Sequence, residues 1–202
     1  MKQQQDVRIR LARLHDAPAI AAVHVRAWQT AYRGIVPDSY LDTMDLAARE
    51  ERWQERLAHP SESEFTFVAE LTGHTKETPG AIIGFASGGP ERNSVAGYDG
   101  ELYGIYLLPE HRGKGIGRRL VAATAKWLSE RGTQSLVIWV LKENLNGRAF
   151  YEALGGQLVS EQTITIGGSS LLDVAYGWPD LRMILHASRD AGGDSHEAAA
   201  VR

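Results

Sequence analysis

Apolar and polar side chains alternate along residues 7–11, with the apolar ones at the odd-numbered positions. A period of two is typical of a strand with one buried face. The spacing then changes to that of a helix, for which Asp16 stands in a capping position and Pro18 suits the first turn. Gly34 interrupts this pattern, so the sequence predicts a strand that leads directly into a helix.

A second helix is predicted over residues 45–57. Its many charged residues share one side, whereas Leu46, Trp53 and Leu57 fall on the other and are expected to face the core. Two segments rich in aromatic and branched residues follow at 65–71 and 81–87, and polar residues 73–80 separate them. This arrangement predicts an antiparallel hairpin.

The rest of the chain alternates strands with helices. We predict a strand at 101–108, an amphipathic helix from Gly115 to Gly132, an apolar strand at 135–141, a short helix capped by Asn146 and ending near Leu154, and strands at 157–166 and 171–178. The order indicates the α/β (α+β) class, with a mixed central sheet of about seven strands and about four flanking helices.

Length and composition favour one domain. The chain has 202 residues, of which 43% are hydrophobic, and this is enough for one sizeable core. We place the domain at residues 1–180. Residues 181–202 are expected to form the C-terminal end, mostly a flexible tail, because the chain from Ser188 onward is small and polar.

Charge and residue usage exclude several kinds of partner. A formal net charge of −3 gives no field that would gather nucleic acid or an anionic membrane. The chain contains no cysteine, and its seven histidines lack ligand spacing, so no metal is expected. No apolar run suits a signal peptide or a membrane span, which favours the cytoplasm. A small-molecule or peptide substrate fits these observations best.

The most informative junction lies at residues 107–117, where a predicted strand enters a helix through a turn with three glycines. Glycines let a backbone approach a ligand closely, and the free N–H groups of a helix start favour an anion such as a pyrophosphate. No Ser or Thr follows Lys114 as a Walker loop requires, and Arg118 stands where a GxGxxG loop has its third glycine. Taken alone, the segment also fits a plain connecting turn.

The motif Arg112-x-x-Gly115-x-Gly117 resembles the (Q/R)xxGx(G/A) signature of the GNAT superfamily of N-acetyltransferases, and the likeness in element order extends over residues 7–178. The resemblance implies a GNAT fold whose sheet is splayed at the strand that ends near Leu107. It further implies that the backbone at Leu107 pairs with pantetheine and that the turn binds the pyrophosphate of acetyl-CoA. The implied cofactor-binding residues are Leu107, Arg112, Gly113, Lys114, Gly115, Ile116, Gly117, Arg118 and Asn146.

The same resemblance implies two catalytic residues. Glu101, at the start of the strand before the turn, corresponds to the general base of many GNAT enzymes, although it also fits a solvated carboxylate at a strand end. Tyr151 lies in a segment similar to N-x-x-A-x-x-[FL]-Y-x-x-x-G, in which the tyrosine protonates the coenzyme thiolate. A plain core aromatic is its alternative role. Gly156 departs from the family pattern, because many members have an aromatic residue there.

The acceptor side is less defined. Residues 28–41 resemble a segment that walls the acceptor site in one bacterial branch of the superfamily, so Trp28, Tyr32 and Tyr40 are candidate substrate residues. Aromatic residues at helical spacing are also common in cores. The loop at 88–100 is a candidate lid or an ordinary surface loop.

These observations predict an acetyl-CoA-dependent N-acetyltransferase, an acyltransferase of class EC 2.3.1, that acts on a primary amine. With no cysteine to carry an acyl group, direct attack in a ternary complex is expected. The alternative is a non-catalytic acyl-CoA-binding sensor of the same fold. The resemblance is compatible with a monomer or a homodimer.

Overall fold

The computed structural model describes residues 6–72 and 80–186. Its first half contains β1 (Val7–Leu11), α1 (Ala17–Ala31), α2 (Asp38–Asp42), α3 (Leu46–Ala58), β2 (Phe65–Leu71) and β3 (Ile82–Pro90). Its second half contains β4 (Gly100–Leu107), α4 (Ile116–Ser129), β5 (Leu136–Leu141), α5 (Leu145–Glu152), β6 (Gln157–Ile166) and β7 (Ser169–Trp178). No helix in these two ranges is long and apolar enough to cross a membrane.

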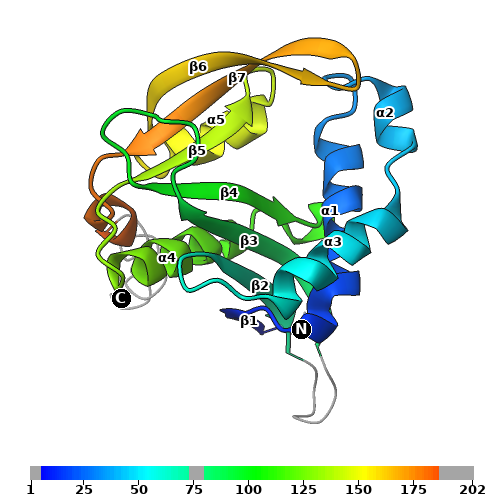
Figure 1. Cartoon of the computed structure of the whole chain (residues 1–202), viewed down its shortest axis with the longest axis horizontal. Coiled ribbons are helices and arrows are strands. Elements are labelled where there is room, and N and C mark those ends of the chain that lie inside the picture. The colour runs from blue at the N-terminus through cyan, green and yellow to red at the C-terminus, as the bar shows by residue number, and fades with distance from the viewer. Residues whose placement is uncertain (1–5, 73–79, 187–202) are drawn as a thin grey trace, which may run out of the picture.

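The strands form one seven-stranded mixed sheet in the order β1-β2-β3-β4-β5-β7-β6 (Figure 1). Every neighbouring pair is antiparallel except β4 and β5, which run parallel. The β2–β3 pairing confirms the predicted hairpin, although residues 73–79 of its loop lie outside the described residues. The predicted α/β fold with a mixed sheet of seven strands is therefore confirmed.

Strands β4 and β5 pair only where Gly100 meets Leu136 and Glu101 meets Val137. Beyond these positions no ladder joins them, so the sheet is splayed between the remainder of β4, up to Leu107, and the end of β5. This is the splay that the resemblance to the GNAT superfamily implied. Because the two strands are parallel, the segments that follow both, the turn before α4 and the start of α5, lie at the same edge of the sheet.

Helices cover both faces of the sheet (Figure 1). Helix α4 packs on β1 to β4 from one side, and α5 packs on β7. Helix α1 contacts β3 and β4 from the other side and carries α3 against its outer surface. The β6–β7 hairpin reaches over to α2, where Gly167 lies against the ring of Tyr40.

Several local predictions were wrong. Asp16 occupies the N-cap position of α1 without capping it, because its carboxylate instead accepts hydrogen bonds from Arg10 and from the backbone of Arg13. Asn144, not Asn146, caps α5: its Oδ1 accepts from the Gly147 N–H at 3.0 Å, and the helix begins one residue later. Asn146 is exposed.

Leu46 was expected to face the core but is 47% exposed. It shares a helix face with Trp53, yet it is the first residue of α3, two turns earlier, directly after the N-cap Asp45. The short helix α2 was not predicted from the sequence.

The packed part of the chain extends beyond residue 180. Leu181 and Ile184 are 2% and 0% exposed and belong to the main core. The Leu181 N–H also donates to the Gln134 carbonyl at 2.9 Å. Residues 181–186 are therefore part of the folded domain, and the rest of the predicted tail lies outside the described residues.

Candidate active site

The turn between β4 and α4 presents backbone rather than side chains. Gly113 and Gly115 have φ values of 70° and 75°, and a Cβ built at either position would meet no atom within 4 Å. Gly115 is the N-cap of α4, and no side chain caps the helix. The first N–H groups of α4 are therefore free to bind an anion.

The cationic side chains of the turn hold its backbone in place. Arg112 Nε donates to the Leu107 carbonyl at 3.3 Å, and Lys114 Nζ donates to the Glu110 carbonyl at 2.8 Å. Both side chains are exposed, so they can also reach a phosphate outside the turn.

The start of α4 lies against α5. A Cβ at Gly117 would approach the Phe150 ring to 3.2 Å, so this glycine permits close packing of the two helices. Arg118 Nη2 lies 3.5 Å from the Ala153 carbonyl at the end of α5. The structure thus brings the turn and the helix that carries Tyr151 together.

Tyr151 is 6% exposed, and its ring packs against Tyr176 and Trp178 with centroid distances of 6.0 and 6.3 Å. Among the described residues its hydroxyl has no hydrogen-bond partner. Burial raises the pKa of Tyr151, and the charges of Tyr106 and Asp173 add to the increase. The hydroxyl therefore stays protonated at neutral pH, as a proton donor must.

An aromatic cluster lies on the opposite face of the sheet, at the C-terminal half of α1. Tyr106 of β4 stacks on His24 at 4.9 Å, and Trp28 contacts Tyr32 at 4.8 Å and Tyr40 at 6.4 Å. The structure thus brings the three candidate substrate residues, Trp28, Tyr32 and Tyr40, together.

Two polar atoms of this cluster, His24 Nδ1 and Trp28 Nε1, are buried without a hydrogen-bond partner. Burial, reinforced by the charge of Arg49, lowers the pKa of His24 to about 3, so this histidine is neutral at pH 7. A bound molecule can supply the missing partners.

Asp173 of β7 was not singled out in the sequence. It is 8% exposed, and burial raises its pKa to about 6 even though hydrogen bonds from Gln162 and the Val174 backbone oppose the increase. A single carboxylate in an otherwise apolar strand, residues 171–178, was the signal in the sequence. Its proximity to the aromatic cluster is a tertiary feature that no local pattern shows.

Glu101 is 2% exposed and pairs with the loop that precedes β4. Arg92 donates to it three times, from Nη2 at 2.7 Å, from Nε at 3.2 Å and from the backbone N–H at 3.0 Å. Asn93 Nδ2 adds a longer contact of 3.4 Å. These contacts satisfy the carboxylate within the protein, and its role as general base stays a prediction.

The same loop is anchored rather than free. The Arg92 guanidinium stacks on the Tyr103 ring at 3.4 Å, and the Asp99 carboxylate accepts from Ser135 Oγ at 2.6 Å. The Tyr98 ring fills the space beside Gly177, where a Cβ would approach its hydroxyl to 2.3 Å. The contacts of Arg92, Tyr98 and Asp99 favour a structural loop over a lid.

Comparison with known proteins identifies the family. The sequence model described as "Acetyltransferase (GNAT) family" matches residues 24–156, which include α1, the turn and Tyr151. The chain belongs to the GNAT acetyltransferase family. As a member of this family, it is an N-acetyltransferase.

Individual relatives agree with this assignment. An uncharacterized N-acetyltransferase of Bacillus subtilis, YuaI, is 39% identical over 175 residues, covering 87% of this chain and 94% of that protein. An aminoglycoside N(6')-acetyltransferase type 1 of Salmonella typhimurium is 29% identical over 103 residues, covering 48% of this chain and 71% of that protein.

The fold also matches a solved structure, the putative acetyltransferase yncA of Salmonella typhimurium with its cofactor acetyl-CoA. The TM-score is 0.62 at 24% identity, and the match covers 87% of this chain and 94% of that one.

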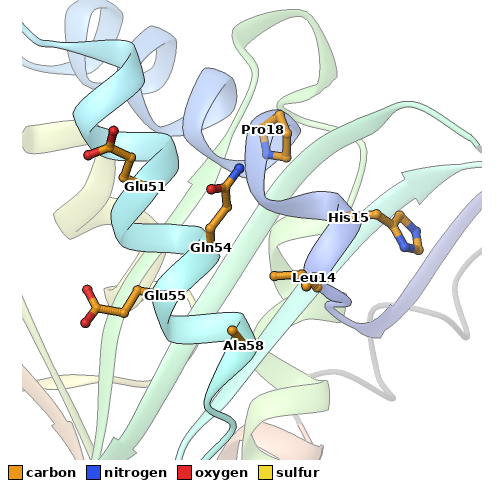
Figure 2. A pocket seen from close by; sticks show the side chains of 7 residues that line it. All are labelled: Leu14, His15, Pro18, Glu51, Gln54, Glu55 and Ala58. Atoms are coloured by element: carbon orange, nitrogen blue, oxygen red, sulfur yellow. The ribbon is translucent and has the colours of Figure 1, made fainter.

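This GNAT acetyltransferase has a further groove away from the turn, between the start of α1 and α3 (Figure 2). It is open to solvent and is lined by Leu14, His15, Pro18, Glu51, Gln54, Glu55 and Ala58. None of the predicted site residues lies in it.

Proposed function

We propose that the protein transfers an acetyl group from acetyl-CoA to a primary amine of a small molecule or peptide. The observation that carries the proposal is the buried side chain of Tyr151, whose hydroxyl has no hydrogen-bond partner among the described residues, on the helix that adjoins the phosphate-binding turn. A hydroxyl in this position suits protonation of the departing thiolate. The solved relative with acetyl-CoA supports the choice of donor.

The turn fits the pyrophosphate of acetyl-CoA. Two glycines, Gly113 and Gly115, have the left-handed conformation of anion-binding backbone turns, and Arg112 and Lys114 add positive charge. Ile116, Gly117 and Arg118 begin α4 and supply the helix N-terminus. Leu107 ends β4 at the splay, where we expect the pantetheine arm to lie. Asn146 is exposed near the start of α5, and its contact with the coenzyme stays a prediction.

We further propose direct attack by the amine in a ternary complex. The sequence has no cysteine, so no thiol of the protein can carry the acetyl group. The relatives include an enzyme named for acetylating an aminoglycoside amine, which supports an amine acceptor here. Trp28, Tyr32 and Tyr40 are the proposed walls of the acceptor site.

Calorimetric titration with acetyl-CoA, with ATP as a control ligand, tests the donor. A thiol-release assay over a panel of primary amines then tests the transfer. We expect saturable binding of acetyl-CoA, weaker binding of ATP, and thiol release with at least one amine. Binding without release across the panel would instead favour the sensor, and absence of binding would refute the proposal.

A further inference from the structure

Asp173 lies on the acceptor face of the sheet. It is paired directly with Leu141 across the β5–β7 ladder, and directly paired residues point to the same face. Leu141 packs with Val36 and Leu41 from the connection between α1 and α3. The carboxylate of Asp173 is therefore on the side of the aromatic cluster, opposite α4 and α5.

Tyr32 packs against the cluster that contains Leu141, so it lies on the same face of the sheet as Asp173. Burial raises the pKa values of Tyr32, Tyr106 and Tyr151, and the charge of Asp173 contributes to each increase. Gln162, its direct partner on β6, adds a side-chain amide. No lysine, arginine or histidine among the described residues forms an ion pair with Asp173.

Glu101 of β4 and Asp173 of β7 pair with opposite ends of β5, the strand that lies between them. Glu101 pairs with Val137 and Asp173 with Leu141, and this spacing along the strand corresponds to about 13 Å. Asp173 acts electrostatically on Tyr151, the proposed acid, whereas Glu101 is bound to Arg92. A buried carboxylate without a cation lacks the positive charge that would offset its burial.

We infer that Asp173 receives the ammonium group of the acceptor among the rings of Tyr32 and Tyr106 and removes a proton from it. The acceptor class is accordingly an aliphatic primary amine, which is protonated in solution, rather than an arylamine, which is not. The inference rests on the proposed acetyl transfer and names the substrate class of that site. Aromatic faces and a carboxylate together favour a cation.

The protons balance as follows. The ammonium gives one proton to Asp173 and becomes a neutral amine, which forms the C–N bond with the acetyl carbonyl carbon. The C–S bond breaks, and Tyr151 protonates the thiolate. The nitrogen loses its second proton to the tyrosinate, which restores Tyr151. Asp173 then releases its proton to solvent, so the net products are the amide, the free thiol and one proton.

Asp173→Asn and Glu101→Gln are the matched variants, because each neutralises one buried carboxylate with little change in shape. In the wild type we expect the acid limb of kcat/KM to fall near the pKa of Asp173, about 6. Asp173→Asn should lower kcat at least about 100-fold and remove this limb. Glu101→Gln should keep the limb even if it lowers stability.

Two further measurements do not depend on the activity of Asp173→Asn. Gln162→Leu retains Asp173 but removes the amide that lowers its pKa, so the acid limb should move to higher pH. Calorimetry with the protein–CoA complex should show that Asp173→Asn weakens binding of an alkylamine at least about tenfold and leaves an arylamine of equal size unchanged.

These outcomes distinguish the inference about Asp173 from the proposed acetyl transfer. If the wild type transfers acetyl groups but Asp173→Asn keeps the acid limb and the alkylamine affinity, or if Glu101→Gln removes the limb, the inference is overturned while the transferase stands. If the wild type binds no acetyl-CoA, both fail.

Discussion

The hydroxyl and the ring of Tyr151 have separable roles, because the ring packs in the core while the hydroxyl has no partner among the described residues. Tyr151→Phe should therefore lower kcat at least about 100-fold while the Kd for acetyl-CoA and the melting temperature stay near wild-type values. Thiol-release kinetics, calorimetry and thermal unfolding measure the three quantities.

Tyr176→Phe is the matched control for Tyr151→Phe. Tyr176 lies beside Tyr151, but its hydroxyl donates to Glu152 and accepts from Arg148. Its removal should lower stability by about 1 kcal/mol and leave kcat within about threefold of wild type. Equal losses of kcat in both variants would assign Tyr151 a packing role only.

A second prediction for single residues concerns the ion pair of Glu101 and Arg92 and its contribution to stability. Glu101→Gln and Arg92→Gln should each lower the free energy of unfolding, and a double-mutant cycle should give a coupling of about 1 kcal/mol. The value is modest because the Arg92 side chain is 52% exposed. Urea unfolding of the four proteins measures it, and a coupling near zero would show that the ion pair does not stabilise the loop.

At the scale of single elements, the turn before α4 depends on backbone conformation. Gly115→Ala places a Cβ at φ 75°, which should cost about 1–2 kcal/mol and disturb the N–H groups that face the phosphates. Gly132→Ala, after α4, meets a φ of 86° with open space around it. Both variants should lose similar stability, but only Gly115→Ala should weaken acetyl-CoA binding, by at least about tenfold in calorimetry. If Gly115→Ala and Gly132→Ala bound acetyl-CoA with equal affinity, the turn would be excluded as the phosphate site.

The same scale shows which elements the sequence could predict. The spacing of apolar residues and the glycines that flank them are local signals, and they predict β2, β6, β7 and α4. The cap of α5 was misassigned, since two asparagines of equal propensity, Asn144 and Asn146, stand two residues apart and only the helix start decides between them.

Tertiary contacts explain the rest. The role of Asp173 depends on β7 packing beside β5 under the α1–α3 connection, which no local pattern encodes. Gly156, where many family members have an aromatic residue, is explained by Trp178: a Cβ at position 156 would approach its ring to 2.7 Å. An aromatic ring from β7 thus occupies the space beside the end of α5.

For the whole molecule, the domain is completed by the segment after β7. Leu181→Ala should lower the free energy of unfolding by about 2–5 kcal/mol, because its side chain is buried in the main core. Met183→Ala, two residues later and 36% exposed, is the control and should change stability by less than about 0.5 kcal/mol. If both substitutions changed the free energy of unfolding by less than about 0.5 kcal/mol, the folded domain would end at residue 180.

The pH dependence of global stability provides a separate test of the pKa of Asp173. Burial raises this pKa from 3.8 to about 6 in the folded protein, so between about pH 4 and 6 the folded state binds more protons than the unfolded chain. Stability attributable to Asp173 therefore falls as pH rises through this range and stays reduced above it. The effect of His24 on stability has the opposite sign, because its pKa is lowered from 6.5 to about 3 in the folded protein. The contribution of His24 to the free energy of unfolding therefore falls as pH drops below about 6.5.

Comparing Asp173→Asn with the wild type isolates the carboxylate, because His24 and all other groups contribute equally to both proteins. The variant should gain stability relative to the wild type between pH 4 and pH 7, by up to about 3 kcal/mol, since it no longer buries a charge. Urea unfolding at intervals of one pH unit measures the difference. A difference that does not change with pH would mean that Asp173 titrates normally in the folded protein, and its carboxylate would then lack the elevated pKa that suits a base acting near neutral pH.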